Sequence, residues 1–577
     1  MNVTLKGGSK DLTAVVDLSV SLFDPAVKFR LPIYPQPSSD ASEDLFETAR
    51  VWLSKCIQTH HCSRAVPFFD QQFLNGSWPK RLVDVDAFPW DDTRVQLVEN
   101  PGPTINYATL SYCWGTVLAL HEKYITTRIN LGDRKERILI HSLPRTLQDA
   151  IIVARRLEIK YLWVDALCIV QDSSEDWGTE SAKMGVIYSQ AQVTICSDAG
   201  PDCDYGLFGG DTDNQTGVLS RLTPGQPKEG KLRNTWTYND IGGRTEWLDD
   251  TTSISEAPLQ SRAWALQERL LSSRILHYGS RMMYWECRKH LELEEFIDPQ
   301  ALTLDKTFPS FIVSMQSLDV LGGSPARQLI GRWYREIIED YSRRNLSNPH
   351  DKFPAISAVA KLIAYHSRSK YLAGLWLLDL QQGLYWKSVG NVTRSSTYIA
   401  PSFSWAAYNS PVRWIDASNG TTTESAGFQV EGFVIEAVGK DAYGRISKGS
   451  LTLRGYVVKA KTEPLPSLAE YAIGTAEEGS SVKHAKDRSL NPNASLITEG
   501  GERCGTAHMD TFQEKPSQEV LCLLLKRSWN TCHMLLLAPK APSDVGYRRV
   551  GVGSISDFVS HNEGWFKGSP GTTLTLI

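Results

Sequence analysis

The sequence predicts an α/β protein whose parallel β-sheet core carries helical elaborations and is followed by a β-rich C-terminal region. Strand-length and helix-length apolar segments alternate between residues 107 and 198, which is typical of right-handed crossovers on a parallel sheet. Longer segments of alternating polarity begin after about residue 400. The composition, with 41% hydrophobic and 22% charged residues, is that of a globular protein, and 577 residues suffice for about three or four domains.

Charge and composition exclude several classes of protein. The 61 Lys and Arg residues do not exceed the 65 Asp and Glu residues, so a general nucleic-acid-binding surface is not expected. We expect neither a secretory signal nor a membrane span, because the N-terminus lacks a basic segment followed by an apolar one and no run of about 18 apolar residues occurs. The ten cysteines are scattered rather than arranged as a disulfide framework. We therefore predict a cytoplasmic protein, although nothing in the sequence separates the cytoplasm from the nucleus.

The first 106 residues divide into two parts. Residues 1–41 are expected to be weakly ordered, and residues 42–106 to form a lead-in to the core. In the lead-in, residues 45–57 place apolar side chains on one helical face. Residues 80–84 and 94–98 alternate in polarity, which predicts two short strands.

The core is expected at residues 107–287. Its helix near residues 147–157 has one buried stripe, because apolar side chains recur at the spacing i, i+3, i+4 and i+7. Residues 209–256 are rich in Gly, Thr, Asp and Pro, which predicts a long insertion loop. The other expected elements are a strand at 107–113, a strand at 161–164, a helix ending near 190, a strand at 192–196, a helix at 262–271 and a strand at 282–287.

The second half of the chain changes from helical to β-rich. Residues 288–400 are expected to be mainly helical, with helices at 325–345 and 355–367. Residues 401–577 are expected to be β-rich and to contain a polar, disordered loop at 465–518. The strands expected there are 428–437, 450–460, 520–527 and 534–538.

Ligands of open α/β sheets bind beyond the carboxyl ends of the strands, and this rule selects the first candidate site residues. Trp114 and Gly115 follow the first strand of the core, and Asp165 follows the second. Gln171 and Asp172 lie a few residues further along the chain. We take all five as candidates for substrate binding. Turn formation and helix capping are the alternative roles of Asp165, Gln171 and Asp172.

Three dense motifs carry a resemblance to a known family. They are residues 107–115 (YATLSYCWG), residues 143–150 (LPRTLQDA) continued by 161–172 (YLWVDALCIVQD), and residues 262–274 (RAWALQERLLSSR). Their order and spacing resemble the signature of the fungal heterokaryon-incompatibility (HET) domain family. The resemblance extends outward from these motifs and covers roughly residues 45–410.

The resemblance implies a fungal intracellular protein of self/non-self recognition and programmed cell death. HET domains have been proposed to be distant relatives of TIR domains, so the resemblance also implies a TIR-like, flavodoxin-like parallel sheet. Some TIR domains cleave the nicotinamide–ribose bond of NAD+ with a glutamate that follows a tryptophan by four positions. Trp264 and Glu268 reproduce this spacing, while Ala265 and Arg269 stand where that group often has Cys and Leu. The resemblance thus implies NAD+ as the substrate and Glu268 as the catalytic residue.

A carboxylate close to the ribose suits this reaction on chemical grounds. Cleavage of an N-glycosidic bond builds positive charge on the sugar, which a carboxylate stabilises, and the neutral nicotinamide leaves without a general acid. Trp264 and Glu268 stand at i and i+4 of the expected helix and share a face, which adds an aromatic ring for substrate binding. The alternative for Glu268 is a structural ion pair with Arg262, Arg269 or Arg274.

The sequence predicts no metal site and no cofactor other than NAD+ as a substrate. Cys56 and residues 60–62 (HHC) form a metal-like cluster, but no convincing second pair of ligands follows. Cys287 and His290 would serve as that pair only if the fold brought them to the cluster. Motifs of P-loop NTPases, Rossmann-type dinucleotide-binding domains, zinc proteases and α/β-hydrolases do not occur.

Three functions remain open at this point. The first is an incompatibility or cell-death factor that hydrolyses NAD+. The second is a non-enzymatic module that self-associates or recruits partners. The third is a small-molecule enzyme of a fungal secondary-metabolite pathway built on the same scaffold. No companion module is visible in the sequence, so the expected partner is an unknown trigger protein or a second copy of the chain.

Overall fold

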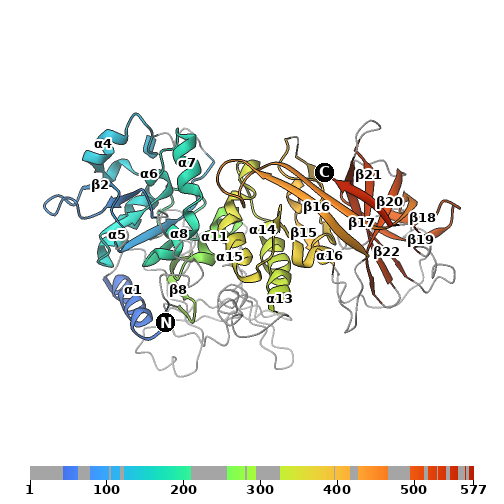
Figure 1. Cartoon of the computed structure of the whole chain (residues 1–577). Helices are drawn as coiled ribbons and strands as arrows, with labels where there is room; N and C mark the ends of the chain where they lie inside the picture. The colour runs from blue at the N-terminus through green and yellow to red at the C-terminus, as the bar shows by residue number, and fades with distance from the viewer. Residues whose placement is uncertain are drawn as a thin grey trace, which may run out of the picture.

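The computed structural model places three parts one after another along the molecule (Figure 1). A nine-stranded sheet with flanking helices forms the N-terminal part, a helical part lies in the middle, and an eight-stranded sheet forms most of the C-terminal part. The structure describes residues 43–60, 62, 78–102, 105–116, 123–208, 257–279, 283–293, 325–390, 392–395, 397–415, 427–465, 494–511, 518–528, 531–540, 546–556, 566, 569 and 571–577. The expectations for residues 1–41, residues 209–256 and His61 lie outside the described residues.

The N-terminal sheet is mixed, with the strand order β4-β2-β1-β5-β3-β6-β7-β8-β9. The predicted parallel core lies at its centre, where β3 pairs in parallel with β5 and β6, and β6 pairs in parallel with β7. Numbered along the chain, these core strands lie in the order 2-1-3-4, which is how a flavodoxin-like sheet begins. The strands are β1 Arg81–Asp84, β2 Arg94–Glu99, β3 Tyr107–Ser111, β4 Ile138–Leu139, β5 Tyr161–Trp163, β6 Val193–Ser197, β7 Arg274–Tyr278, β8 Met283–Cys287 and β9 Leu291–Leu293.

Antiparallel strands extend this parallel core at both edges. We expected β1 and β2 in a lead-in, but β1 pairs with β5 and β2 pairs with β1, so the lead-in and the core share one sheet. β8 and β9 continue the sheet beyond β7 and past the expected border at residue 287. The sequence analysis missed β7 because its buried Arg274 and His277 break the apolar pattern of a strand with both faces covered.

The helices of the N-terminal part agree with the apolar periodicity except in one place. A single helix was expected to end near residue 190, but the structure has two, α7 and α8. Ser173 caps α7 by accepting the backbone N–H of Asp176 at 3.3 Å. The helical elements are α1 Glu43–Lys55, η2 Cys56–His60, α4 Leu131–Glu136, η3 Ile140–Ser142, α5 Arg145–Arg156, α6 Asp165–Cys168, α7 Ser174–Ser181, α8 Met184–Gln190, η5 Pro258–Ser261 and α11 Ala263–Leu271.

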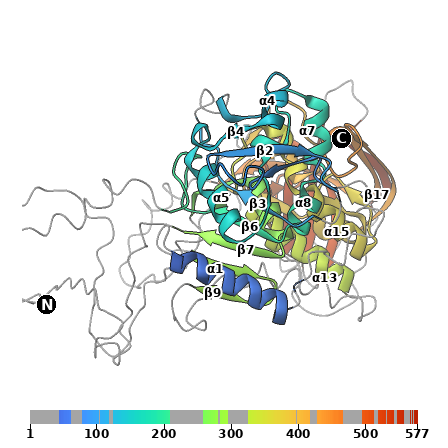
Figure 2. The same ribbon diagram turned by 90° about the vertical axis from the view of Figure 1, so that its left-hand side faces the viewer.

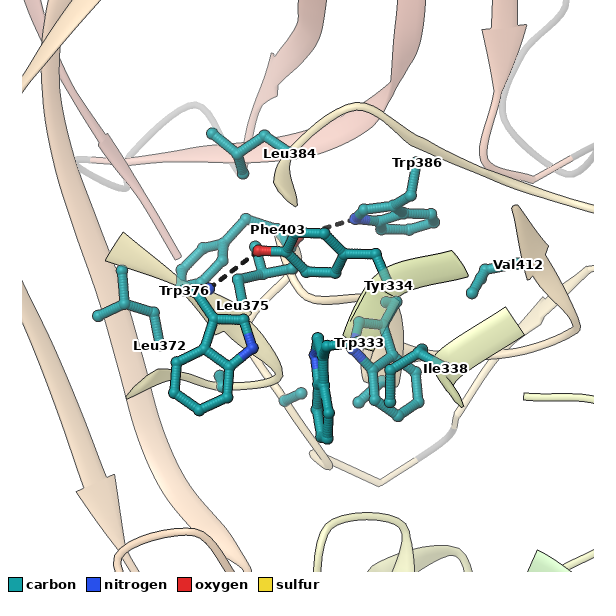
Figure 3. Packing of buried hydrophobic residues seen from close by; sticks show 14 of the residues in the cluster. Trp333, Tyr334, Ile338, Leu372, Leu375, Trp376, Leu384, Trp386, Phe403 and Val412 are labelled. Carbon is teal, nitrogen blue, oxygen red and sulfur yellow. Dashed lines mark hydrogen bonds between the residues drawn. The ribbon is translucent and has the colours of Figure 1, made fainter. Parts of the chain in front are cut away.

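The middle part packs around a dense aromatic core (Figure 3). The backbone N–H of Trp376 donates to the Tyr334 hydroxyl at 3.1 Å, and Trp386 Nε1 donates to the carbonyl of Phe403 at 3.2 Å. These side chains are buried, and several of the 17 tryptophans of the chain lie in this core. The elements are α13 Pro325–Arg332, η7 Trp333–Ile338, α14 Glu339–Tyr341, η8 Pro349–Asp351, η9 Pro354–Ile356, α15 Ser357–Ser367, β10 Tyr371–Leu372, β11 Leu375–Trp376, η10 Leu377–Asp379, α16 Leu380–Gly383, β12 Trp386–Ser388, β13 Thr393–Arg394, η11 Trp405–Ala407, β14 Tyr408–Asn409 and β15 Val412–Trp414.

The C-terminal sheet confirms the expected β-rich region and returns on itself. β17 pairs with both β18 and β20, so the path through β18, β19, β22, β21 and β20 leads back to β17. β18 and β19 lie within residues 465–518, where we expected only a loop, because the strands are short and Gly501 with its φ of +86° forms their turn. The strands are β16 Phe428–Ala437, β17 Ile446–Pro464, β18 Ala494–Ile497, β19 Arg503–Met509, β20 Gln518–Ser528, β21 Thr531–Pro539, β22 Tyr547–Ser556 and β23 Gly571–Leu576.

One hydrophobic cluster connects the three parts. It includes Leu266 and Leu270 of α11, Trp333 of η7 and Leu453 of β17, all of them buried. α11 therefore contacts two parts of the molecule. Its apolar side chains pack into this cluster, and its polar side chains contact residues of the N-terminal sheet, as described next. Burial of these apolar side chains stabilises the arrangement of the three parts through the hydrophobic effect.

Candidate active site

The ends of three strands and one helix define the candidate site. Ser111 ends β3, Asp165 follows β5, and Asp198 follows β6. The order of the core strands switches between β3 and β6, and open α/β sheets bind ligands in the crevice at such a point. Glu268 of α11 reaches the end of β3, where it contacts Ser111. The fold thus brings the predicted Glu268 to the predicted strand ends.

Glu268 is a carboxyl group held by hydroxyl groups in the protein interior. The residue is 7% exposed, and Ser111 Oγ donates a hydrogen bond to Glu268 Oε2. The Tyr188 hydroxyl of α8 is a second hydrogen-bond partner. Burial raises the pKa of Glu268 to about 7, against the opposing effects of the Ser111 hydrogen bond and the positive charge of Arg262. The Glu268 carboxyl group therefore keeps its proton to a higher pH than an exposed glutamate does.

A second carboxyl group, Asp165, lies close enough to influence Glu268. Its negative charge adds to the rise in the pKa of Glu268. Trp114 Nε1 donates to Asp165 Oδ2 at 2.9 Å, and the backbone N–H of Ala166 donates to Oδ1 at 2.7 Å. Burial raises the pKa of Asp165 as well, while the charge of Arg262 opposes this rise. Asp165 and Trp114 therefore form a hydrogen-bonded unit beside the Glu268 carboxyl group.

Arginines surround Glu268 in sequence, but they contact other groups. Arg262 Nη1 donates to the carbonyl of Tyr112, and Arg269 Nη2 pairs with Glu286 Oε2 at 2.9 Å. Within the part of the chain that the structure describes, Glu268 forms no ion pair. The structural ion pair that was the alternative for Glu268 is therefore not seen among these residues.

Three other predicted site residues shape the turns around the strand ends. Gly115 has a φ of +89°, and a Cβ atom there would lie 2.7 Å from the Cβ of Asp202. Only glycine tolerates both conditions. Gln171 Nε2 donates to the carbonyl of Asp165 at 2.9 Å, and the exposed Asp172 accepts the backbone N–H of Arg128 at 2.9 Å. These contacts of Gln171 and Asp172 are those of turn-forming groups.

Trp264 packs at the junction between the N-terminal and middle parts. Its ring lies edge to face against Trp177, with the ring centroids 6.5 Å apart. It also hydrogen bonds to Asp351, and the Arg445 guanidinium lies 4.9 Å from the Trp177 ring centroid. The aromatic ring that hydrogen bonds to a carboxyl group of the site is instead that of Trp114, whose partner is Asp165.

Comparison with known proteins assigns a family to this site. Residues 107–268 match the family model of Heterokaryon incompatibility protein (HET). The chain carries a HET domain. The match begins at the first residue of β3 and ends at Glu268, and it connects the chain with heterokaryon incompatibility in general. Searches of curated proteins and of solved structures each found no match. No helix among the described residues is long and apolar enough to cross a membrane.

A buried ionic network joins the HET domain to the strands that follow it. His277 Nδ1 lies 2.7 Å from Asp198 Oδ2, His277 Nε2 lies 3.2 Å from Glu286 Oε2, and Arg269 pairs with Glu286. Burial disfavours the charged imidazole, but Asp198 and Glu286 outweigh it and raise the pKa of His277. Although burial also opposes their ionisation, the positive charges lower the pKa of Asp198 and bring the pKa of Glu286 to about 2. This network was not predicted from the sequence. The available signal was the presence of charged residues within two short, otherwise apolar segments, which form β7 and β8.

The fold also brings Cys287 to the cysteines of the lead-in. The Sγ atoms of Cys56, Cys62 and Cys287 all lie within 4.8 Å of one another, and all three residues are buried. The ring of His290 stacks on the ring of His60, with centroids 4.4 Å apart. We expected no metal site because no second pair of ligands was evident in the sequence. The structure brings Cys287 to the cluster, whereas the His290 ring stacks on His60 and is not among the clustered ligand atoms.

Proposed function

We propose that this chain is a cell-death factor of heterokaryon incompatibility and that its HET domain hydrolyses NAD+ to nicotinamide and ADP-ribose. The observation that carries this proposal is the position of Glu268 at the switch point of the sheet, buried and with a pKa of about 7. Ionisation of such a group costs folding free energy, and strongly shifted carboxyl groups cluster at sites where chemistry uses them. The nearby Asp165 and Arg262 add the charges that a polar, charged ligand requires.

In the proposed reaction, the bond between ribose C1′ and the nicotinamide ring nitrogen breaks. The electron pair of this bond goes to the nitrogen, which cancels its positive charge, and positive charge develops on the ribose. The ionised Glu268 carboxylate stabilises that charge. Water then adds to C1′ and gives a proton to Glu268, whose pKa near 7 suits it for accepting a proton at neutral pH. Loss of this proton to solvent restores the ionised enzyme.

The neighbouring side chains have supporting roles in this proposal. Ser111 orients the Glu268 carboxylate through its hydrogen bond. Trp114 is half-buried, so one face of its indole ring can stack on the nicotinamide while Asp165 fixes its edge. Arg262 is also half-buried and offers a positive charge to the diphosphate of NAD+. Gly115, within the same turn as Trp114, lets the backbone of this turn pass close to Asp202.

The test follows nicotinamide release from NAD+ by the purified full-length protein at several pH values around 7. We expect release whose rate rises with pH through about 7, because the ionised form of Glu268 is the active one. Glu268→Gln keeps the size and hydrogen-bonding capacity of the side chain and is expected to lower the rate by at least about 100-fold. Glu175→Gln, at an exposed position of α7, is the matched control and is expected to leave the rate unchanged.

Two results would contradict the hydrolase. One is the absence of nicotinamide release by the monomeric and by the self-assembled protein, and the other is undiminished release by Glu268→Gln. Cell death that persists in the host with Glu268→Gln would favour the non-enzymatic, self-associating module instead. Turnover of a different small molecule that depends on Glu268 would favour the biosynthetic enzyme.

A further inference from the structure

Three buried thiols meet where the N-terminal helical segment contacts the edge of the HET-domain sheet. Cys56, Cys62 and Cys287 are 0%, 4% and 3% exposed, and their Sγ atoms lie within 4.8 Å of one another. All three are free thiols rather than halves of disulfides. In a tetrahedral zinc site with Zn–S bonds of about 2.3 Å, the sulfur atoms lie about 3.8 Å apart. The three thiols therefore stand close to the spacing that a zinc ion requires.

His60 brings a nitrogen ligand to the same place. Its Nδ1 atom lies 3.4 Å from Cys287 Sγ, and a nitrogen and a sulfur bound to one tetrahedral zinc ion lie about 3.5 Å apart. Local backbone geometry accounts for this position, because Cys56–His60 forms the single π-helical turn η2, whose first and fifth residues share a face. The stacked ring of His290 holds the imidazole of His60 against the thiols.

We propose that Cys56, Cys62, Cys287 and His60 bind one structural zinc ion. Binding releases the three thiol protons to solvent and leaves the imidazole neutral, with Nδ1 as its ligand atom. His60 Nδ1 contacts Cys287 Sγ but lies outside the group of three mutually close sulfur atoms, so binding of the ion would draw the ring toward Cys56 and Cys62. The site takes four protein ligands and is closed to solvent, and this distinguishes a structural zinc site from a catalytic one.

The surroundings of the thiols suit an anionic metal centre. Zinc with three thiolates and a neutral imidazole carries a net charge of about -1. The buried guanidinium groups of Arg274 and Arg288 lie beside the cluster, and Arg274 Nη2 donates to the carbonyl of Cys62. Backbone N–H groups complete the shell: that of His290 donates to Cys287 Sγ at 3.3 Å, and that of Arg288 donates to Cys62. Such outer contacts orient metal ligands and stabilise thiolates.

The ion would connect segments that are far apart in the sequence. His60 and Cys287 are 227 residues apart, and α1 lies beside β9 and β7 at the edge of the sheet (Figure 2). Near the thiols, α1 and β9 are also joined by an ion pair between Lys55 Nζ and Glu292 Oε1 at 2.7 Å. An ion pair near the surface contributes little stability. Four coordination bonds would hold the helix to the sheet far more firmly.

The first experiment measures the zinc content of the full-length protein purified under reducing conditions, by elemental analysis. We expect about one zinc ion per chain in the wild type and a loss of most of it in Cys287→Ser. Cys196→Ser is the matched control, because Cys196 is a buried cysteine outside the cluster, and it is expected to keep the ion. Zinc-free wild-type protein that takes up none from a buffered zinc solution would overturn the proposal. So would a disulfide between two of the three cysteines found by mass spectrometry of that protein.

A second experiment keeps the proposal testable if Cys287→Ser does not fold. Cobalt replaces zinc in the wild-type protein, and the absorption spectrum is expected to show tetrahedral cobalt with thiolate charge-transfer bands. His60→Cys is expected to retain about one ion per chain and to strengthen these bands by adding a fourth thiolate. His290→Ala is expected to leave the ligand set unchanged. An octahedral cobalt spectrum, or one that His60→Cys does not alter, contradicts the proposed ligands.

Discussion

The carboxyl group of Glu268 makes the stability of the protein depend on pH. Its pKa in the folded chain is raised from 4.5 to about 7, so between these values the folded state binds more protons than the unfolded state. The free energy of unfolding therefore falls as the pH rises from 4.5 to 7, and the whole loss is present above 7. A buried carboxyl group of this kind thus weakens the fold at neutral and higher pH.

Glu268→Gln is expected to remove this pH-dependent loss. The neutral amide can still accept the Ser111 hydrogen bond, so the variant should be more stable than the wild type above neutral pH, by about 3 kcal/mol. At acid pH the two proteins should be nearly equal in stability. Urea unfolding at about pH 5 and about pH 8 measures the difference. A stability difference that is the same at both pH values would show that Glu268 does not titrate in this range.

Some contacts of the candidate site could be predicted from the sequence and others could not. Trp114 and Asp165 were predicted from the rule that strand ends meet at one edge, and the structure joins them by a hydrogen bond. The helical spacing of Trp264 and Glu268 gave a common face but not the neighbours of each ring or carboxyl group. The ionic network around His277 was missed, because Asp198 lies 79 residues away in sequence and only the sheet brings the two together.

The contact between α8 and α15 gives a prediction at the scale of one element. A Cβ atom at Gly185 of α8 would lie 2.2 Å from the Cβ of Ala358, so Gly185→Ala forces the helices apart. Despite the better helix propensity of alanine, we expect this variant to lose about 1 to 3 kcal/mol of stability. Gly178→Ala in α7 is the control: nothing lies within 4 Å, and it should gain up to about 1 kcal/mol. Thermal unfolding of both variants measures the contrast, and equal shifts would refute close packing at Gly185.

Elements were predicted well where one face is buried and poorly where burial is complete or the element is short. The stripe of the helix around residues 147–157 appears as α5, and the alternation around residues 428–437 appears as β16. β7 was missed because charged side chains lie in a strand that is buried throughout. β18 was missed because its four residues show too few alternations to stand out from a polar segment, and β19 because its burial does not alternate.

At the scale of the whole molecule, Arg549 ties the C-terminal sheet to the middle part. Its side chain is fully buried, its Nε pairs with Asp510 Oδ2 at 2.8 Å, and its Nη1 donates to the carbonyl of Leu384 at 2.7 Å. The guanidinium also lies 3.4 Å from the centroid of the Trp386 ring. The Arg549 guanidinium therefore binds polar groups of both the C-terminal sheet and the middle part.

Arg549→Met is expected to cost about 3 to 5 kcal/mol of stability, because it leaves Asp510 buried without a counter-charge. Denaturant unfolding of the full-length protein measures this loss. Arg548→Met is the control, since this half-buried neighbour in β22 points to the opposite face of the strand, and a loss of about 1 kcal/mol or less is expected. Adding Asp510→Asn to Arg549→Met should restore part of the loss. An equal loss in both arginine variants would rule out the role of the buried pair.

The arrangement of the parts was the least predictable feature of the molecule. The sequence separated a lead-in, a core and a helical region, whereas β1, β2, β8 and β9 all belong to one sheet. Antiparallel additions at a sheet edge need only short segments, and local patterns do not state which strands pair. The three dense motifs were informative because the match to the HET family covers β3, β5, β6 and the part of α11 that carries Glu268.

The border of the family match, at Glu268, falls inside α11, whose Leu266 and Leu270 pack into the cluster shared with the middle and C-terminal parts. The stretch that the family model matches is therefore smaller than the stretch whose side chains pack together. A gene rearrangement that transferred residues 107–268 alone would cut this helix and leave out β7 and β8.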